Sequence, residues 1–458
     1  MTVTADPLRA LQELLRLPTV AAPSGGSYDE APFVAAHEAL RRHFPQVMAE
    51  EVIEVEPHGL LVRVAADPAA ADDGSDPVVL MAHLDVVPVG DEERWTHPPL
   101  SGEVVDGQLW GRGTLDDKGQ LVAAIAALES LLADGGRPAR DVWLSFGGDE
   151  EVLGRGARNA VDILRERGVQ PWFVLDEGGA VASSAFPGVD APLGVIGVSE
   201  KGAVSLRLTA SGRGGHASTP AKGGPAARIA TAITRLERRP FAAALNPPTA
   251  EMMRRLGPHL PAPFRPLVER ADRLAPALAR AMVAAGPEAA ALVRTTLAVT
   301  TLKGSPAINV IPTSVEAGVN LRVAVGETAV AAIERVRRIV GQEIDVRVVE
   351  QHDPSPLSPV DDAAFALLER TITEVYPDAV PIPYVLYAAT DSRHFTAICD
   401  RVYRFAPFRM SKAQRESIHS YDEHIGVEDL IDGVRWYRAL LDGLPPTDAV
   451  GDTEGGAR

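Results

Sequence analysis

Acidic and histidine residues cluster at five separate places in this 458-residue chain, each where a hydrophobic run gives way to a loop. The clusters fall at positions 83–85, 111–119, 149–151, 176–179 and 418–420. Carboxylates and neutral imidazoles, without a thiolate, are the ligands that suit a catalytic zinc or a similar divalent ion. A chain with this pattern must adopt a fold that brings the ends of several distant segments to one place.

Strand and helix signals alternate through the first part of the chain. Short apolar runs predict buried strands at 77–82, 142–146 and 172–175, and Ala- and Leu-rich segments predict helices at 120–133 and 157–167. This order predicts an α/β fold with a largely parallel sheet flanked by helices. Functional groups gather beyond the carboxyl ends of parallel strands, and several of the clusters follow a predicted strand directly.

The pattern changes near residue 199, where strands begin to alternate polar and apolar residues. Strands are predicted at 202–210, 296–302, 314–325 and 345–349, and helices at 226–236 and 327–340. This β-α-β-β-α-β order predicts a small open sheet with helices on one face, inserted into the first domain.

The length also favours more than one domain, because 458 residues exceed one ordinary core. We expect a catalytic domain made of 1–198 and 357–444, a lid domain at 199–356, and a disordered tail at 445–458. The segment 247–294 within the lid indicates several short helices. They could extend the lid, contact a second subunit or shape the substrate pocket.

Composition excludes several kinds of partner. The formal net charge of −17 argues against nucleic-acid binding, which needs a basic surface. No apolar run is long enough to span a bilayer, and residues 1–20 indicate an amphipathic helix instead of a signal peptide. The single cysteine, Cys399, cannot form an intrachain disulfide. We therefore expect a cytoplasmic protein with no nucleic-acid or membrane partner.

Individually, the clusters also fit plain roles as helix caps or solvated loops. Asp85 could hold the second ring nitrogen of His83 and so fix its tautomer. The adjacent Asp116 and Asp117 would be costly to bury without a cation. In the acidic run at 149–151, one carboxylate can bind an ion while its neighbour takes a proton from water.

Together the motifs resemble the zinc-dependent family that includes aminoacylase, glutamate carboxypeptidase and succinyl-diaminopimelate desuccinylase. The resemblance rests on His-Leu-Asp-Val-Val-Pro at 83–88, Gly-Arg-Gly-x-x-Asp-x-Lys-Gly at 111–119, Asp-Glu-Glu at 149–151 and the late His419. The segments 173–179, 200–202 and 390–393 are most similar to the carboxypeptidase S branch, which includes N-fatty-acyl amino acid hydrolases.

This resemblance implies a zinc-exopeptidase sheet with an inserted, ferredoxin-like lid domain. It implies two zinc ions per subunit, for which Co²⁺ or Mn²⁺ would also fit. His83, Asp116 and Asp176 would hold one ion. His419, Asp116 and Glu151 would hold the other, so that Asp116 bridges them. Asp176 stands where several branches of the family have glutamate.

The resemblance assigns further roles. Glu150 would be the general base, Asp85 would orient His83, and His216 would stabilise the oxyanion. The residues expected to bind substrate are Asn309, Arg322 and Arg393. The peptide after the bridging aspartate, Asp116–Asp117, is expected to be cis.

These roles predict a dinuclear zinc metallopeptidase that hydrolyses dipeptides or short peptides with a free C-terminal carboxylate. An N-acyl amino acid amidohydrolase is the alternative, and a non-catalytic peptide-binding relative is a third. A two-metal phosphoesterase fits the ligands, but the negative net charge counts against it. The lid is the expected surface for a homodimer.

Overall fold

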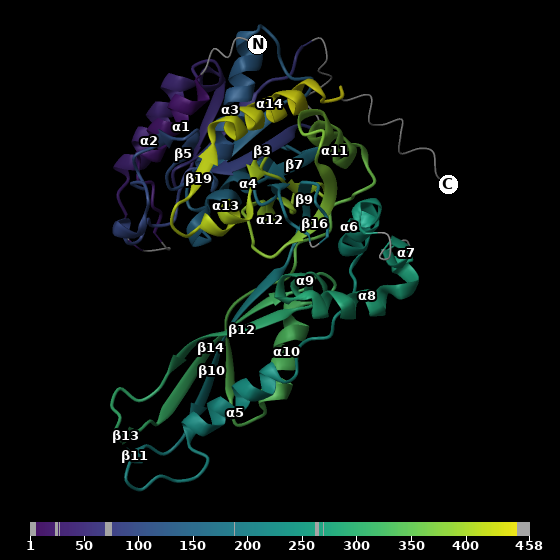
Figure 1. The fold of residues 1–458 in the computed structure, drawn as a ribbon. Coiled ribbons are helices and arrows are strands. Elements are labelled where there is room, and N and C mark those ends of the chain that lie inside the picture. Colours follow the sequence, from purple (N-terminus) through teal and green to yellow (C-terminus); the bar gives the residue numbers. More distant parts are fainter. Residues whose placement is uncertain are drawn as a thin grey trace.

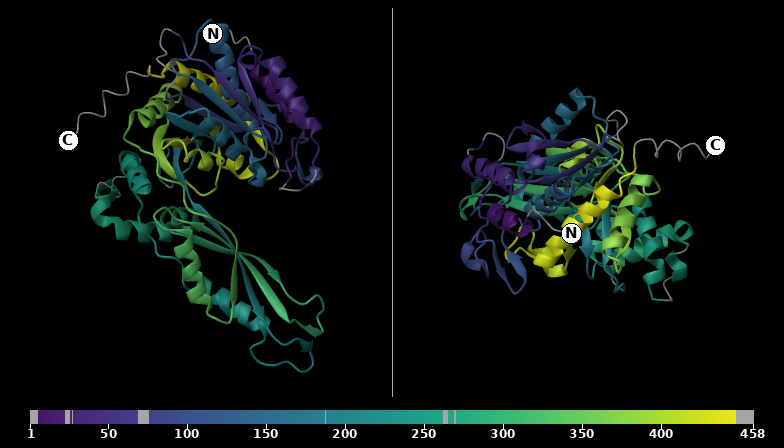
Figure 2. Two further views of the ribbon diagram at one scale, coloured as in Figure 1. Left: turned by 180° about the vertical axis from the view of Figure 1, so that it is seen from behind. Right: turned by 90° about the horizontal axis from the view of Figure 1, so that it is seen from above.

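Two parts of unequal size make up the computed structural model of the chain (Figure 1). It describes residues 6–22, 26, 28–68, 76–186, 188–261, 265–268 and 270–446. The larger part is a sheet covered by helices, and the smaller part extends from it as an elongated lid (Figure 2). This α/β architecture with an inserted lid confirms the fold expected from the sequence.

A mixed ten-stranded sheet with a parallel centre forms the larger part. In spatial order its strands are β1 (Glu51–Val55), β2 (Gly59–Val64), β6 (Val142–Gly147), β3 (Val78–His83), β7 (Phe173–Asp176), β17 (Val402–Arg404), β9 (Leu193–Glu200), β8 (Ala180–Ala182) and β18 (Arg409–Met410), with β16 (Val380–Leu386) paired to β9. Strands β3, β6 and β7 run parallel and end at the same edge. The loops that follow these three strands therefore lie next to one another.

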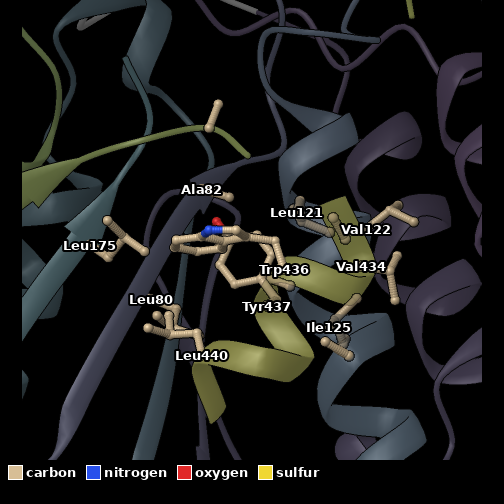
Figure 3. Packing of buried hydrophobic residues seen from close by; sticks show 14 of the residues in the cluster. Leu80, Ala82, Leu121, Val122, Ile125, Leu175, Val434, Trp436, Tyr437 and Leu440 are labelled. Carbon is tan, nitrogen blue, oxygen red and sulfur yellow. The ribbon is translucent and has the colours of Figure 1, made fainter. Parts of the chain in front are cut away.

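Helices cover both faces of this sheet. One face carries α1 (Pro7–Leu15), α2 (Ala31–His43), α3 (Lys118–Ala133), α11 (Ala363–Val375) and α14 (Val427–Asp442), and the other carries α4 (Gly156–Glu166) and α12 (Ser392–Phe395). Leu80 and Leu175 of the sheet meet Ile125 of α3 and Trp436 of α14 in the main core (Figure 3). Trp436 is fully buried, and truncation of such a side chain costs about 3–5 kcal/mol.

Short elements complete the rim of the larger part. A three-stranded sheet contains β4 (Glu103–Val105), β5 (Gln108–Trp110) and β19 (His424–Gly426). Helix α13 (Lys412–Ser417) precedes β19 and begins with a capping box between Ser411 and Gln414. The single-turn helices are η1 (Val47–Ala49), η2 (Glu92–Arg94), η3 (Glu150–Val152) and η4 (Gly257–His259).

The lid has the predicted β-α-β-β-α-β order. Its antiparallel sheet runs β12 (Thr296–Lys303), β14 (Ser314–Val323), β10 (Gly202–Ser211) and β15 (Asp345–His352), and helices α5 (Pro225–Glu237) and α10 (Ala329–Val340) pack on one face. A two-stranded ribbon of β11 (Gly215–His216) and β13 (Val310–Ile311) lies at the tip farthest from the larger part (Figure 1).

The chain crosses between the two parts next to Gly202. A Cβ at this position would lie 2.6 Å from the backbone oxygen of His352 on the return strand, so only glycine allows this approach. The side chain of Lys201 donates to the carbonyls of Ala291 and Arg294, at 3.0 and 2.9 Å. The crossing is thereby fastened to the helical segment beside it.

The helices expected in the segment 247–294 form, and their packing selects among the alternatives that the sequence leaves open. They are α6 (Pro247–Leu256), α7 (Arg265–Val268), α8 (Ala271–Ala285) and α9 (Pro287–Val293). Met252 and Met253 of α6 share a hydrophobic cluster with Leu193 of β9 and Ile382 of β16. The segment therefore covers the edge of the larger sheet and does not extend the lid sheet. Its apolar side chains are buried against apolar side chains of β9 and β16.

No helix in the described ranges is long and apolar enough to cross a membrane. Of the predicted tail, Pro445 and Pro446 accept hydrogen bonds from Arg140, and positions 447–458 lie outside the described residues.

Candidate metal centre

His83 is the last residue of β3 and lies buried at the carboxyl edge of the sheet. Its Nδ1 is 2.9 Å from the backbone oxygen of Asp85 and 3.5 Å from Asp85 Oδ1. Its Nε2 faces Asp116 Oδ1 at 2.9 Å. The contact at Nδ1 favours the tautomer that leaves Nε2 as the ligand atom.

Asp116 stands between two histidines. Its Oδ1 contacts His83, and its Oδ2 lies 3.0 Å from His419 Nε2. It sits in the loop between β5 and α3, and the Asp116–Asp117 peptide is cis, as expected. The two carboxylate oxygens thus face different partners, which is the arrangement of a bridging ligand.

Glu150 and Glu151 form the single turn η3 just after β6. Glu151 Oε2 lies 3.0 Å from His419 Nε2. Asp85 accepts the backbone N–H groups of Glu150 at 3.2 Å and of Glu151 at 3.0 Å. Asp85 therefore positions the acidic turn itself, in addition to its contact with His83.

The structure corrects one expected ligand. Glu177, not Asp176, groups with His83 and Asp116, and Glu177 Oε1 lies 3.8 Å from His83 Nε2. Asp176 instead accepts the backbone N–H of Ser392 at 3.0 Å. The register explains the difference, because Leu80 pairs with Leu175 and Asp176 is therefore level with Met81, short of the edge. Glu177 is one residue nearer to that edge and has the longer side chain.

His419 completes the second group from a loop between α13 and β19. Its side chain is 54% exposed, and its φ of 59° is uncommon for a residue other than glycine. The two groups are His83, Asp116 and Glu177, and Asp116, Glu151 and His419, with ligand atoms within 4.8 Å of one another in each. They share Asp116.

Contacts between the histidines and the carboxylates shift the pKa values of the groups in this centre. Hydrogen bonds to Asp116 and Glu151 raise the pKa of His419 to about 10. Burial alone would raise the pKa of Asp116, but hydrogen bonds from His419 and His83 hold it below its usual range. Burial raises the pKa values of Glu150 and Glu177 well above normal. Such a set of buried acids is costly without a cation.

The donor set fits a divalent cation at each group. Each group offers hard carboxylate oxygens and imidazole nitrogen, the donors that zinc and similar metals take in catalytic sites. Glu151 Oε1 is buried and has no hydrogen-bond partner among the described residues, which fits a carboxylate oxygen that would coordinate a cation.

The expected substrate residues are dispersed. Arg322 on β14 pairs with Ala203 and Thr296, near the crossing between the two parts. Arg393 donates to the backbone oxygen of Thr390 at 2.7 Å, within its own loop.

His216 and Asn309 lie side by side in the ribbon at the tip of the lid. The backbone oxygen of Asn309 accepts from Ala217 N at 3.1 Å, and His216 Nδ1 contacts Ser218 Oγ at 2.8 Å. Both residues are exposed. Within one chain, this tip is the end of the lid farthest from the larger part, which carries the metal-ligand residues (Figure 1).

Glu177 is the candidate ligand that the sequence interpretation did not name. A signal was present, because several branches of the family have glutamate at this point and Glu177 directly follows Asp176. Only the strand register distinguishes the two neighbours.

Residues 79–443 match the profile of Peptidase family M20/M25/M40. The chain belongs to this family. Its members are metal-dependent metallopeptidases and amidohydrolases, and the chain is accordingly a hydrolytic enzyme. The relationship confirms the resemblance drawn from the motifs.

Relatives within the M20 family are similar to this chain over nearly its whole length. The N-fatty-acyl-amino acid synthase/hydrolase PM20D1 of Xenopus tropicalis is 34% identical, over 96% of this chain and 87% of the relative. Probable carboxypeptidase S-like 2 of Dictyostelium discoideum is 31% identical, over 96% and 85%. The M20 metallo-carboxypeptidase Sso-CP2 of Sulfolobus solfataricus shares the fold, with a TM-score of 0.70 at 17% identity, over 96% and 99%.

Proposed function

We propose that this enzyme hydrolyses an amide bond whose amine side is an amino acid with a free carboxylate, at a dinuclear metal centre. The observation that carries the proposal is the pair of ligand groups that share Asp116, with Glu150 buried beside them. Two zinc ions are the proposed metals. When bound, they supply Lewis-acid chemistry that polarises the scissile carbonyl and makes water more acidic.

Glu150 is the proposed general base. It precedes the proposed ligand Glu151 in η3, and burial raises its pKa well above the usual value for a glutamate. A carboxylate held next to a metal ligand can take a proton from water and return it. We assign to it the proton of the attacking water, which it delivers to the leaving amine. Asp85 holds this turn by the backbone of Glu150 and keeps the base in place.

Arg322 is the proposed anchor for the substrate carboxylate. Guanidinium groups bind carboxylates by charge-assisted, often paired hydrogen bonds. Arg322 is half-buried on the lid sheet, and it contributes to lowering the pKa of Lys201 to about 8, after the larger effect of burial. The two cations are therefore neighbours at the crossing between the parts.

Two substrate classes meet these requirements. Peptides with a free C-terminal carboxylate are the first class, supported by the proposed anchor and by the name of a carboxypeptidase S-like relative. N-acyl amino acids are the second class, favoured by the name of the 34% identical relative. Both release a free amino acid, so they differ only in the acyl side of the bond.

A matched substrate panel tests the proposal. Glycyl, acetyl and long-chain acyl derivatives of the same amino acids would be compared, each with and without chelator. Chelator-sensitive release of the amino acid is expected. Preference for glycyl compounds supports the peptide class, and preference for acyl compounds supports the second class. Absence of release from every compound, with two metals bound, would contradict the proposal.

We further propose that a homodimer completes the site. His216 and Asn309 belong to the ribbon at the far end of the lid, whereas the metal ligands belong to the larger part (Figure 1), so a second copy must supply them if they contact substrate. Near this tip the apolar side chains of Leu302, Ile308 and Val310 are exposed. Exposed apolar groups next to an edge strand are typical of a surface that another copy covers.

Subunit mixing tests the shared site. His216→Ala and Glu150→Ala should each be inactive alone. In a mixed dimer, one site combines its own Glu150 with the partner's His216, so mixing the two variants should restore activity. If mixed dimers form and remain inactive, His216 does not act across subunits.

A further inference from the structure

Two buried, charged residues beside the candidate ligands have no role in the proposed reaction. Arg112 lies in the Gly-Arg-Gly segment that leads to Asp116, and Glu423 follows His419 by four positions. The two loops are far apart in the chain, yet Arg112 Nη1 donates to Glu423 Oε2 at 2.6 Å. Both side chains are almost fully buried, at 2% and 0% exposed.

Glu423 organises the loop that carries the bridging ligand. Its Oε1 accepts the backbone N–H groups of Leu115 at 2.8 Å and of Asp116 at 3.2 Å. Its Oε2 accepts Gly113 N at 3.1 Å as well as Arg112. One carboxylate thus receives four donors from a single loop, which fixes the backbone on which Asp116 stands.

Arg112 makes the reverse connection. Its Nη2 donates to the backbone oxygen of Ser420, next to His419, at 2.6 Å. Its guanidinium also lies 5.1 Å from the ring centre of Trp95, a cation–π contact. Each loop therefore places a side chain on the backbone of the other.

His419 needs such support more than the other ligands do. His83 ends a buried strand, whereas His419 stands in a loop with a positive φ and a half-exposed ring. Its ring contacts the carboxylates of Asp116 and Glu151. The distance between His419 and Asp116 is therefore set by how the two loops are joined. A buried, charge-assisted network is a rigid joint.

We propose that Arg112 and Glu423 are positioning residues that hold His419 and Asp116 at the spacing needed to bind the second metal ion. This inference rests on the proposed dinuclear centre. It predicts a selective loss: the group of Asp116, Glu151 and His419 loses affinity, while the group containing His83 and Glu177 keeps most of its own. Residues that hold metal ligands in place without binding the metal typically contribute about 10–100-fold to metal affinity.

Glu423→Gln is the principal variant. The amide has one acceptor oxygen and one donor nitrogen, so it cannot receive both pairs of donors. Asp141→Asn is the matched control. Asp141 is also buried and accepts from Arg63 Nε at 2.8 Å and Ala66 N at 2.9 Å. It lies directly before β6, at the opposite end of the strand from the metal centre.

Zinc binding to the full chain would be measured by titration in zinc-buffered solution, with metal content determined on the same samples. Thermal unfolding of the metal-free proteins would report stability separately. Asp141→Asn should bind two ions, each with the same affinity as in wild type. Glu423→Gln should bind the first ion normally and the second about 10–100-fold more weakly.

Several results would overturn the inference. Loss of stability in Glu423→Gln together with wild-type binding of both ions shows a purely structural role. An equal weakening of the second ion in Asp141→Asn shows the same. If Glu423→Gln does not fold, Arg112→Lys replaces it, because lysine keeps the charge but not the fork that reaches Ser420. Wild-type affinity for both ions in that variant refutes the inference. Wild type that binds fewer than two ions refutes the dinuclear centre itself.

Discussion

Two neighbouring acids, Asp176 and Glu177, offer a direct test of the site geometry. Glu177→Gln removes a carboxylate from the group that contains His83 and Asp116. Asp176→Asn leaves that group intact and keeps an oxygen that can accept Ser392 N. Both substitutions replace an acid by its amide of nearly equal size, so they differ mainly in which carboxylate is lost.

The magnitudes follow from the contacts. A four-ligand zinc site binds with about 10–16 kcal/mol, or roughly 3 kcal/mol for each ligand. Loss of Glu177 should therefore weaken one metal site by about 100-fold or more. Asp176→Asn exchanges a charged acceptor for a neutral one in a single hydrogen bond, which costs stability about 1 kcal/mol. Its metal affinity should change much less.

Isothermal titration of each metal-free variant with zinc would measure the affinities, and urea unfolding would measure stability. The expected result is one strong site in Glu177→Gln and two in Asp176→Asn. If Asp176→Asn loses the metal as completely as Glu177→Gln, the register argument is wrong. Wild-type zinc binding by Glu177→Gln would also refute it.

Three further perturbations address catalysis, substrate and pH. Glu150→Gln should keep its metals but lower kcat by roughly 10²–10⁴-fold, because the proton acceptor is lost; near-normal turnover with full metal content would contradict this role. Arg322→Ala should lower kcat/KM for free carboxylates by about 10–100-fold, since a charged hydrogen bond contributes about 1.5–3 kcal/mol, and an equal loss on methyl esters would argue against an anchor. His394 has a pKa lowered to about 3 by burial and by Arg393 and Arg158. The unfolded chain, with a histidine pKa near 6.5, then binds more protons, so stability falls as pH drops below about 6.5. Relative to neutral pH, protonation linked to His394 should lower the free energy of unfolding by about 2 kcal/mol at pH 5. In urea unfolding between pH 7.5 and 5, the free energy of unfolding of His394→Gln should therefore decrease less than that of wild type.

Local patterns in the sequence predict most of the secondary structure. Apolar runs of strand length become β3, β6 and β7, and the Ala-rich segment after Asp117 becomes α3, close to the predicted bounds. The inserted lid is predictable because residues along its strands alternate between a buried and an open face; in β10, Val204, Leu206 and Leu208 are buried and the residues between them are more open. These periodicities depend on near neighbours in the chain, so they can be read without the fold.

The sequence by itself therefore determined the α/β framework, the lid and the clusters that meet at the sheet edge. Tertiary structure decided which member of a cluster faces the others. The choice of Glu177 over Asp176 depends on the pairing of β7 with β3, and the packing of α6 depends on matching apolar surface on β16. The remote position of His216 depends on the direction in which the lid extends. Register, packing and domain direction are relations between distant segments, and no local pattern encodes them.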